Sequence, residues 1–391
     1  MSIAARTASD VERTAEATSL PSPRDLTPRR AEVENRQEII AQWLRQEQQE
    51  AVFLFDPDNI AWFSAGGDLG SQTGLGSPPG FLFVTPRQRC LISSNEHTDR
   101  IFERELDGLG FQSKQFSWTR PVEEIIGDLR GGRAIFSDQP GRGLVDRSAT
   151  LATLRRKLTA FDQARYRTLA AHVSHAVEAT CRSIRLGELE WEVAAHLAHR
   201  LLHHGIEPVD IHILSTTNPH PRPRMSPNAV DKGCSILVTG RTHGLYFTTA
   251  RTMSFGPPDK TQADAHRIAT LVAGTFLRFS LPGESIGEVF RKGMRIYQKF
   301  GAEFAWMDSP QGSLTGYSRS FGSFLPTSEE HLEPGMTVCW HPLVNGSVSA
   351  DALIVGEGES DPLLYCEDWP TVGVDIQGVV VPRPDILIRE S

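Results

Sequence analysis

A pattern of glycines and Glu-Val pairs occurs twice in the second half of the chain, 96 positions apart. The first copy contains Gly187, Glu192, Val193 and Gly205, and the second contains Gly283, Glu288, Val289 and Gly301. Each copy is followed by two runs of β-branched and apolar residues, a pattern typical of a hairpin. A repeat of this length indicates an architecture rather than a short motif. With two copies, it predicts a domain with internal pseudo-twofold duplication whose halves enclose any binding site.

Length and charge narrow the class of protein. A chain of 391 residues has room for two or three domains with a sizeable core. Its net charge of -8 does not favour a nucleic-acid partner, because that mode of binding needs a clustered basic surface. No apolar run approaches the roughly 18 residues that a membrane span requires. We therefore expect a globular protein that binds neither nucleic acid nor membrane.

The cysteines and the N-terminus indicate the compartment. The five cysteines form no Cys-x-x-Cys pair; they are Cys90, Cys181, Cys234, Cys339 and Cys366. An odd number of scattered thiols is typical of a reducing compartment and not of a disulfide framework or a zinc site. The first residues lack the apolar region of a secretory signal, and Asp10, Glu12 and Glu16 argue against a transit peptide. These features predict a cytoplasmic protein.

The chain divides into three parts by composition and periodicity. Residues 1–30 are rich in Ser, Thr, Pro and Arg, which predicts a disordered tail. Residues 31–150 alternate short β-branched runs with helical patterns, which predicts an α/β domain with partly parallel strands. Residues 151–391 combine long amphipathic helices with hairpin-like strands, which predicts an α+β domain.

Several stretches, in this order, resemble the creatinase, aminopeptidase P and prolidase family. They are Asn59-Ile-Ala-Trp-Phe-Ser-Ala-Gly, Leu186-Gly-Glu-Leu-Glu-Trp-Glu-Val, Thr249-Ala-Arg-Thr, Leu332-Glu-Pro-Gly-Met and Ala352-Leu-Ile-Val-Gly-Glu. The resemblance covers roughly residues 50 to 360. It implies a creatinase-type N-terminal domain followed by a pita-bread domain with the internal duplication described above. It also implies a homodimer that acts on a small-molecule substrate.

The metal ligands of the family are where this sequence departs from the resemblance. Its metallopeptidases hold two divalent ions with two Asp, one His and two Glu. The corresponding positions here are Thr239, Thr248, Arg319, His341 and Ala350. Hard divalent cations need several oxygen donors, and an arginine in the cage would repel them. We therefore predict a divergent member of the family without a metal, and no other cofactor is indicated.

Creatinase is the metal-free branch that this chain resembles in style. Creatinase splits a C–N bond of a guanidinium compound and uses a histidine as the proton shuttle. In the matching loop, the equivalent position lies near Arg224, and the nearest imidazole is His220. An arginine stays protonated near neutral pH, whereas a histidine exchanges protons there. Either His220 has taken this role from a shifted loop, or the role is lost.

Other residues are candidates for the same cleft. We consider His220 and His341 as catalytic residues because imidazole both accepts and donates protons near neutrality. The candidate substrate-binding residues are Arg224, Arg251, Arg319, His212, His243 and Thr248. A guanidinium binds a carboxylate through two parallel hydrogen bonds. The structural alternative for Arg319 is an ion pair with a carboxylate of its own domain.

Four histidines fall on one predicted helix. They are His196, His199, His203 and His204. The spacing of His199 and His203 is that of a helical metal pair, but no Glu lies between them in the His-Glu-x-x-His manner. We therefore expect these side chains to be solvated or to cap the helix.

Two functions of different class fit these observations. The first is a metal-independent hydrolase or lyase that acts on a small, anionic, amino-acid-like compound. The second is a catalytically inactive pita-bread protein that binds a peptide or a protein partner. The histidines discriminate between the two, because an enzyme needs a proton shuttle and a binding module does not.

Overall fold

The structure is a computed structural model that describes residues 26–70, 79–215, 220, 225–366 and 368–390. The chain divides between residues 156 and 157 into two compact units, and residues 243–245 group with the N-terminal one. The predicted tail of residues 1–30 lies outside the described residues up to position 25. Residues 27–30 belong to the first described helix. Within the described residues, no helix is long and apolar enough to cross a membrane.

The N-terminal unit is built around a mixed sheet in the order β4-β3-β2-β1-β5-β6. Its strands are β1 (Val52–Leu54), β2 (Gly80–Val84), β3 (Arg89–Ser94), β4 (Gln112–Phe116), β5 (Phe136–Ser137) and β6 (Val145–Asp146). Its helical segments are α2 (Thr27–Gln46), α3 (Pro57–Phe63), α4 (Thr98–Ile101), η1 (Phe102–Leu106), α5 (Val122–Arg130) and α6 (Ser148–Leu154). Three neighbouring pairs of strands are parallel and two are antiparallel. The predicted α/β domain with partly parallel strands is confirmed.

A buried carboxyl group ties this unit together. Asp138 accepts hydrogen bonds from the backbone N–H groups of Phe55 and Asp56 and from the side chain of Asn59. Burial raises the pKa of Asp138 to about 6, although the three N–H donors act in the opposite direction. One side chain thus joins the end of β5 to the segment between β1 and α3.

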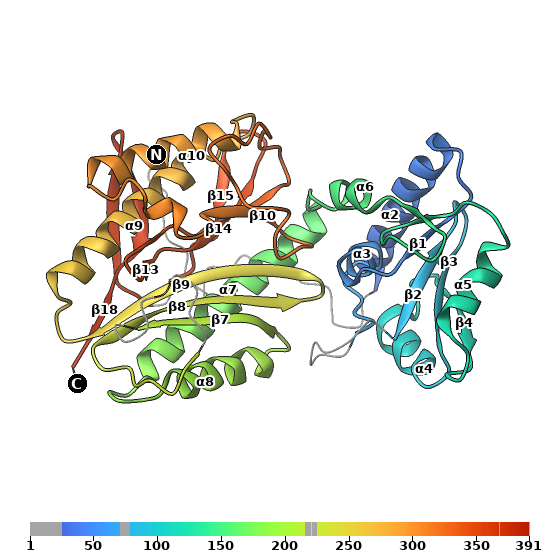
Figure 1. Cartoon of the computed structure of the whole chain (residues 1–391), viewed down its shortest axis with the longest axis horizontal. Coiled ribbons are helices and arrows are strands. Elements are labelled where there is room, and N and C mark those ends of the chain that lie inside the picture. The colour runs from blue at the N-terminus through green and yellow to red at the C-terminus, as the bar shows by residue number, and fades with distance from the viewer. Residues whose placement is uncertain (1–25, 71–78, 216–219, 221–224, 367, 391) are drawn as a thin grey trace. The chain divides into compact units, whose positions relative to one another are not determined.

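The C-terminal unit repeats one order of elements, as Figure 1 shows. The first half contains α7 (Ala160–Ser183), α8 (Glu190–His203), β7 (Glu207–Ser215), β8 (Gly233–Thr242) and β9 (Leu245–Phe255). The second half contains α9 (Lys260–Phe279), α10 (Ile286–Lys299), β10 (Gly312–Thr315), β11 (Thr337–Trp340) and β14 (Asp351–Val355). The predicted α+β domain with duplicated halves is confirmed.

The repeated glycines Gly187 and Gly283 occupy equivalent positions in the two halves. Gly187 and Gly283 both follow the long helix with a φ of 83°, which favours glycine because it has no Cβ. The N–H of Gly187 donates to the carbonyl of Val230, and that of Gly283 donates to the carbonyl of Leu332. The repeat therefore records one local structure that is used twice.

Each half packs its helices on one face of a sheet. The first sheet has the order β18-β9-β8-β7, where β18 is Leu387–Arg389, and α7 and α8 cover one face of it (Figure 1). The second sheet has the order β10-β11-β14-β15, where β15 is Ser360–Pro362. Its Val338, Trp340 and Leu353 pack into one core with α9 and α10. In each sheet the opposite face is left for contacts between the two halves.

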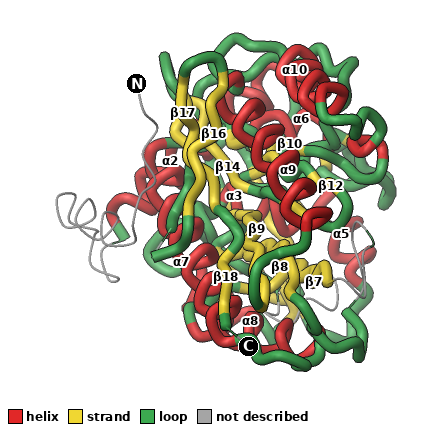
Figure 2. Tube along the Cα trace, turned by 90° about the vertical axis from the view of Figure 1, so that its left-hand side faces the viewer, coloured by secondary structure: helices red, strands yellow, loops and turns green. Residues whose placement is uncertain are grey.

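The remaining elements follow the second half or lie within it. They are η2 (Ala305–Met307), β12 (Leu343–Val344), β13 (Ser347–Val348), β15 (Ser360–Pro362), β16 (Thr371–Ile376), β17 (Val379–Pro384) and β18 (Leu387–Arg389). Figure 2 shows β16 and β17 as a hairpin near α9. Val374, Ile376 and Val381 of this hairpin pack against Leu271 and Phe279 of α9. Sequence reasoning missed this hairpin.

A buried network of charges joins the two halves of the C-terminal unit. The Nε atom of Arg251 on β9 donates to Glu178 of α7 at 2.8 Å, and its Nη1 atom lies 3.7 Å from Asp351 of β14. Asp351 also pairs with Arg383 of β17. The side chains of all four residues are at most 1% exposed. Each charge of the network therefore faces an opposite charge.

We expect Arg251→Leu to lower the free energy of unfolding of the C-terminal unit by about 3 to 5 kcal/mol, because it leaves Glu178 and Asp351 buried without this partner. The matched control is Arg295→Leu on the exposed surface of α10, which should change it by less than about 0.5 kcal/mol. Urea unfolding measures both values, and hydrogen exchange of β9 amides assigns the loss to this unit. Equal effects for the two variants would contradict a structural role for Arg251.

Candidate functional site

The strands of the first half have one face toward the helices and one face toward the second half. Gly240 of β8 faces α7, since a Cβ at this position would lie 2.8 Å from Val173. Side chains alternate along a strand, so Thr239 and Leu237 lie on the other face. Leu237 packs there against Leu343 and other residues of the second half. We call this side of β7, β8 and β9 the inner face.

Two threonines lie next to each other on the inner face. The hydroxyl oxygens of Thr239 on β8 and Thr248 on β9 are 2.8 Å apart, so one hydroxyl donates to the other. The pair has two O–H groups and uses one of them internally. The second O–H and the remaining lone pairs can bind a water molecule or a substrate oxygen.

An ion pair lies beside the threonines. Asp210 of β7 is the register partner of Thr239, so their side chains share the inner face. The Nη2 atom of Arg319, in the loop after β10, lies 2.5 Å from the carboxylate of Asp210. The side chain of Arg319 is 50% exposed and that of Asp210 is 21% exposed. Arg319 thus forms an ion pair with a carboxylate of its own domain, and solvent still reaches its guanidinium.

A second ion pair and a histidine extend the inner face along the strands. His212 lies two residues after Asp210 on β7, and strand alternation places it on the same side. The Nη1 atom of Arg241 lies 3.1 Å from Glu207, its register partner. The guanidinium of Arg241 also lies 5.6 Å from the ring centroid of Tyr246 on β9.

The second half contributes a thiol and an imidazole. Val338 and Trp340 of β11 face the helix-covered core, so Cys339 points to the opposite side. Its Sγ atom lies 3.9 Å from the carbonyl oxygen of Thr248. His341 follows two residues later, is half-buried, and its backbone N–H donates to Gln311. The alternation of the strand therefore places Cys339 on the side of β11 that meets Thr248, and His341 is the first residue after the strand.

Two predicted residues are placed elsewhere. Arg251 points away from the inner face to Glu178 of α7 and is 1% exposed, so we withdraw it as a substrate ligand. Ala350 is 1% exposed in an apolar cluster with Leu214, Leu237 and Val348. Its methyl group offers no donor for a metal or a substrate.

Two further predicted residues, His243 and His220, lie outside helices and strands. His243 is exposed in the turn between β8 and β9, and its Nδ1 atom is 3.3 Å from the carbonyl oxygen of Gly66. His220 is exposed, and the structure shows no contact between it and the described residues of the inner face. Arg224 lies outside the described residues. The structure thus brings together Thr239, Thr248, Arg319 and His212, but not His243 or His220.

A family model shows which protein family the chain belongs to. The model of metallopeptidase family M24 matches residues 164–381, which is more than half of the 391 residues. The chain belongs to metallopeptidase family M24. This confirms the resemblance to the creatinase, aminopeptidase P and prolidase family. A search of curated protein sequences found no match.

Solved structures of M24-type proteins share the fold of the chain. The prolidase of Pyrococcus horikoshii OT3 superposes with a TM-score of 0.73 at 17% identity, covering 85% of this chain and 99% of that one. The Xaa-Pro dipeptidase of Bacillus anthracis gives 0.71 at 14% identity, covering 91% and 100%. A variant of Escherichia coli aminopeptidase P gives 0.68 at 15% identity, covering 86% and 94%. At these identities the likeness shows the two-domain fold.

The residues of the inner face do not fit a pair of divalent ions of the M24 type. The two threonine hydroxyls are neutral and bonded to each other, and the guanidinium of Arg319 adds a positive charge beside them. A dication would be repelled by that charge and would compete with it for Asp210. Among the described residues, no group of three or more His, Cys, Asp or Glu could hold a metal ion.

Sequence reasoning missed Asp210, Arg241 and Cys339. The sequence does contain a signal for Asp210. Asp210 and His212 are two residues apart, which is the spacing of side chains on one face of a strand. The Arg319 partner of Asp210 is 109 positions away, and no local pattern predicts that pairing. Cys339 lies among apolar residues, and no local sequence pattern predicts its contact with Thr248.

We predict that the purified M24 protein holds no stoichiometric Mn, Co or Zn and does not cleave X-Pro peptides. The physical reason is the donor set: two hydroxyls, one imidazole, a methyl group and a guanidinium cannot replace four carboxylates and an imidazole. Elemental analysis of protein purified without chelator measures the metal content. Close to two equivalents per chain, removable with loss of activity, would contradict the prediction.

Proposed function

We propose that the chain is a metal-independent hydrolase that acts on a small, anionic, amino-acid-like compound. The observation that supports this most is the Asp210–Arg319 ion pair beside the Thr239–Thr248 pair. In this proposal, the guanidinium of Arg319 provides the positive charge that metal ions provide in metallopeptidases. The reaction we propose is hydrolysis of a C–N bond, or related lyase chemistry.

Arg319 is the group that binds the substrate anion in this proposal. A guanidinium has five N–H donors in a fixed plane, and one carboxylate does not use all of them. Asp210 holds one edge of the guanidinium, which orients the group before a ligand arrives. The half-exposed opposite edge is available for the carboxylate of the substrate in a bidentate contact.

Histidine side chains handle the protons in this proposal. The candidates are His212 on the inner face, His341 directly after β11, and His220 from the loop. One imidazole removes a proton from a water molecule, whose oxygen attacks the carbon of the C–N bond. As that bond breaks, the leaving nitrogen takes a proton from the imidazolium. The free O–H of the threonine pair donates to the oxygen that gains negative charge.

The setting that we propose is a cytoplasmic homodimer. The homodimer rests on the family resemblance. The cytoplasmic location rests on the five cysteines, which form no disulfide and of which Cys181, Cys234, Cys339 and Cys366 are buried.

The alternative function is that of a catalytically inactive M24 protein that binds a peptide or a protein partner. It is supported by the residues at the five ligand positions expected from the resemblance, none of which is Asp or Glu. Such a protein would use the inner face for recognition and would not need a proton shuttle.

We expect Arg319→Ala to weaken the binding of an anionic amino-acid derivative by about 1.5 to 3 kcal/mol, the range for a hydrogen bond to a charged group. The ligand is first found by a thermal-shift screen of N-substituted amino acids, and calorimetry then measures its affinity. Affinity should also fall as salt is added, because the contact is between charges.

Arg295→Ala, which removes an exposed arginine of α10, serves as the matched control. Unchanged affinity in a folded Arg319→Ala protein would show that Arg319 serves only its ion pair with Asp210.

We expect the variant that lacks the true proton shuttle to lose about two to four orders of magnitude in turnover, while ligand affinity stays within a few-fold. His341→Gln, His212→Gln and His220→Gln are compared with the parent for turnover and for affinity. A ligand that binds all four proteins equally and is never turned over would refute the hydrolase and support the binding protein.

A further inference from the structure

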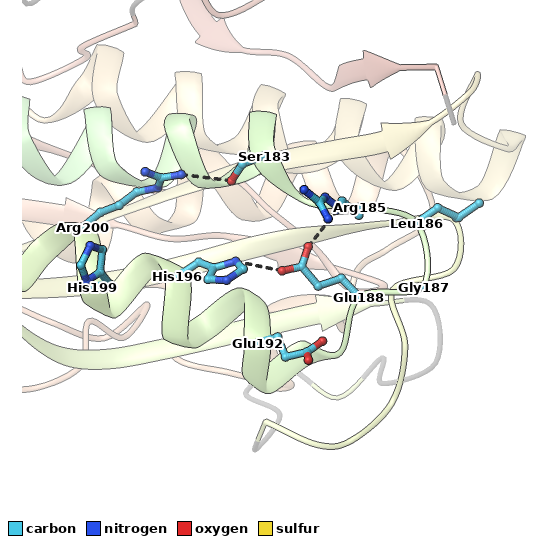
Figure 3. Close-up of a pocket in the computed structure, with 9 residues that line it drawn as sticks. All are labelled: Ser183, Arg185, Leu186, Gly187, Glu188, Glu192, His196, His199 and Arg200. Atoms are coloured by element: carbon cyan, nitrogen blue, oxygen red, sulfur yellow. Dashed lines mark hydrogen bonds and ion pairs between the residues drawn. The ribbon is translucent and has the colours of Figure 1, made fainter.

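A second pocket lies on the outer side of the first half, away from the inner face. Its volume is about 660 Å³, within the range of small-molecule sites. It is formed by the end of α7, the connecting loop and residues along α8 from Glu192 to Arg200, as Figure 3 shows. The lining residues are Ser183, Arg185, Leu186, Gly187, Glu188, Glu192, His196, His199 and Arg200. Nothing in the proposed reaction uses them.

The two carboxylates of this pocket are already engaged. Glu188 accepts a hydrogen bond from the backbone N–H of Arg185 at 2.8 Å, and the Nδ1 atom of His196 lies 2.9 Å from its other oxygen. Glu192 accepts the backbone N–H of Leu189 at 3.0 Å, which caps α8. The carboxylates therefore organise the loop and the helix start.

The cationic groups of the pocket keep donors available. The guanidinium of Arg185 is exposed and makes no ion pair or hydrogen bond with the described residues. Arg200 makes one side-chain contact there, from Nη2 to the hydroxyl oxygen of Ser183 at 3.2 Å. Figure 3 shows Ser183 between the two arginines. The ring of His199 is exposed and lines the same pocket.

We propose that this pocket binds a small molecule through a dianionic phosphate group. Two guanidinium groups, one from the loop and one from α8, offer charge-assisted hydrogen bonds to several oxygens of a single phosphate. His199 adds a ring N–H, and Ser183 adds a hydroxyl. A phosphate carries about two negative charges and three terminal oxygens, whereas a carboxylate carries one charge and two oxygens. The donor set therefore matches a phosphate better than a carboxylate.

The size of the pocket favours a phosphomonoester over free phosphate. A volume of about 660 Å³ leaves room beside the phosphate for an organic group. The side chain of Leu186 is 53% exposed and forms an apolar part of the wall. An organic group placed against Leu186 would remove apolar surface from water.

The pocket is linked to the inner face through α8. Glu190, the first residue of α8, accepts hydrogen bonds from the hydroxyls of Ser215 and Ser226. Ser215 ends β7, the strand that carries Asp210 and His212. A ligand that fixes the start of α8 would therefore also fix the end of β7.

Calorimetric titrations with inorganic phosphate, phosphoserine and adenosine monophosphate test the proposal, with serine and adenosine as phosphate-free partners. We expect saturable binding of the phosphate-bearing compounds, tighter for at least one monoester than for free phosphate, and none for serine or adenosine. The double variant Arg185→Gln/Arg200→Gln should weaken phosphate binding by at least about tenfold, because it removes charge-assisted hydrogen bonds.

The matched control Arg295→Gln/Arg104→Gln removes the same charge from exposed positions elsewhere and should bind as the parent does. No saturable binding of phosphate or of either monoester would overturn the proposal. Equal weakening in both double variants would also overturn it, since that result indicates only a general charge effect. The proposed hydrolase can fail its own tests without changing these titrations, because no residue of the inner face is altered.

Discussion

The contact of Arg251 with Glu178 and Asp351 fixes the geometry on which the candidate site depends. Arg251 lies on β9, Glu178 on α7 and Asp351 on β14, so the contact joins both halves of the duplicated domain. Because all three side chains are fully buried, displacing one half would leave a charge without its counter-ion in an apolar interior. The network therefore holds β9 against the second half, and Thr248 is presented from the opposite side of the same strand.

In the proposed function, the guanidinium of Arg319 on the inner face provides the positive charge that metal ions provide in metallopeptidases. In metallopeptidases of this fold class, metal ions supply the charge that binds and polarises a substrate. Here a guanidinium held by Asp210 lies next to two hydroxyls that are bonded to each other. A guanidinium binds and orients an anion well, but it stays protonated and cannot generate hydroxide from water. A hydrolase with this site therefore needs a separate base, for which His212 on the inner face and His341 directly after β11 are the candidates.

Much of the fold was predictable because the two copies have glycines at equivalent positions, where the backbone needs a positive φ. Gly187 and Gly283 take the same left-handed conformation, which other residues adopt at a cost. The long helices were predictable from apolar periodicity and from their first turns, as with Asp259, which accepts the backbone N–H of Gln262 at the start of α9. Among the helical patterns of residues 31–150, one forms only the short helix α4 followed by the π-type turn η1.

The candidate site was predictable only in part. The positions of Thr239 and Thr248 followed from the resemblance, and the structure brings them within hydrogen-bond distance. The sequence already indicates that Arg251 and Thr248 lie on opposite faces of β9. They are three residues apart, and an odd spacing on a strand gives opposite faces. The Asp210–Arg319 pair was not predictable. It depends on the register of β7 with β8, which a bulge between Pro208 and Asp210 shifts by one residue.

Diffraction from crystals grown in excess Mn²⁺, measured at the manganese absorption edge, tests the central claim most directly. The claim is that a guanidinium has replaced the metal centre on the inner face. It predicts no anomalous peak beside Thr239 and Thr248, with Arg319 still paired with Asp210. Two peaks about 3.5 to 4 Å apart on the inner face, the spacing of a two-metal site, would contradict it.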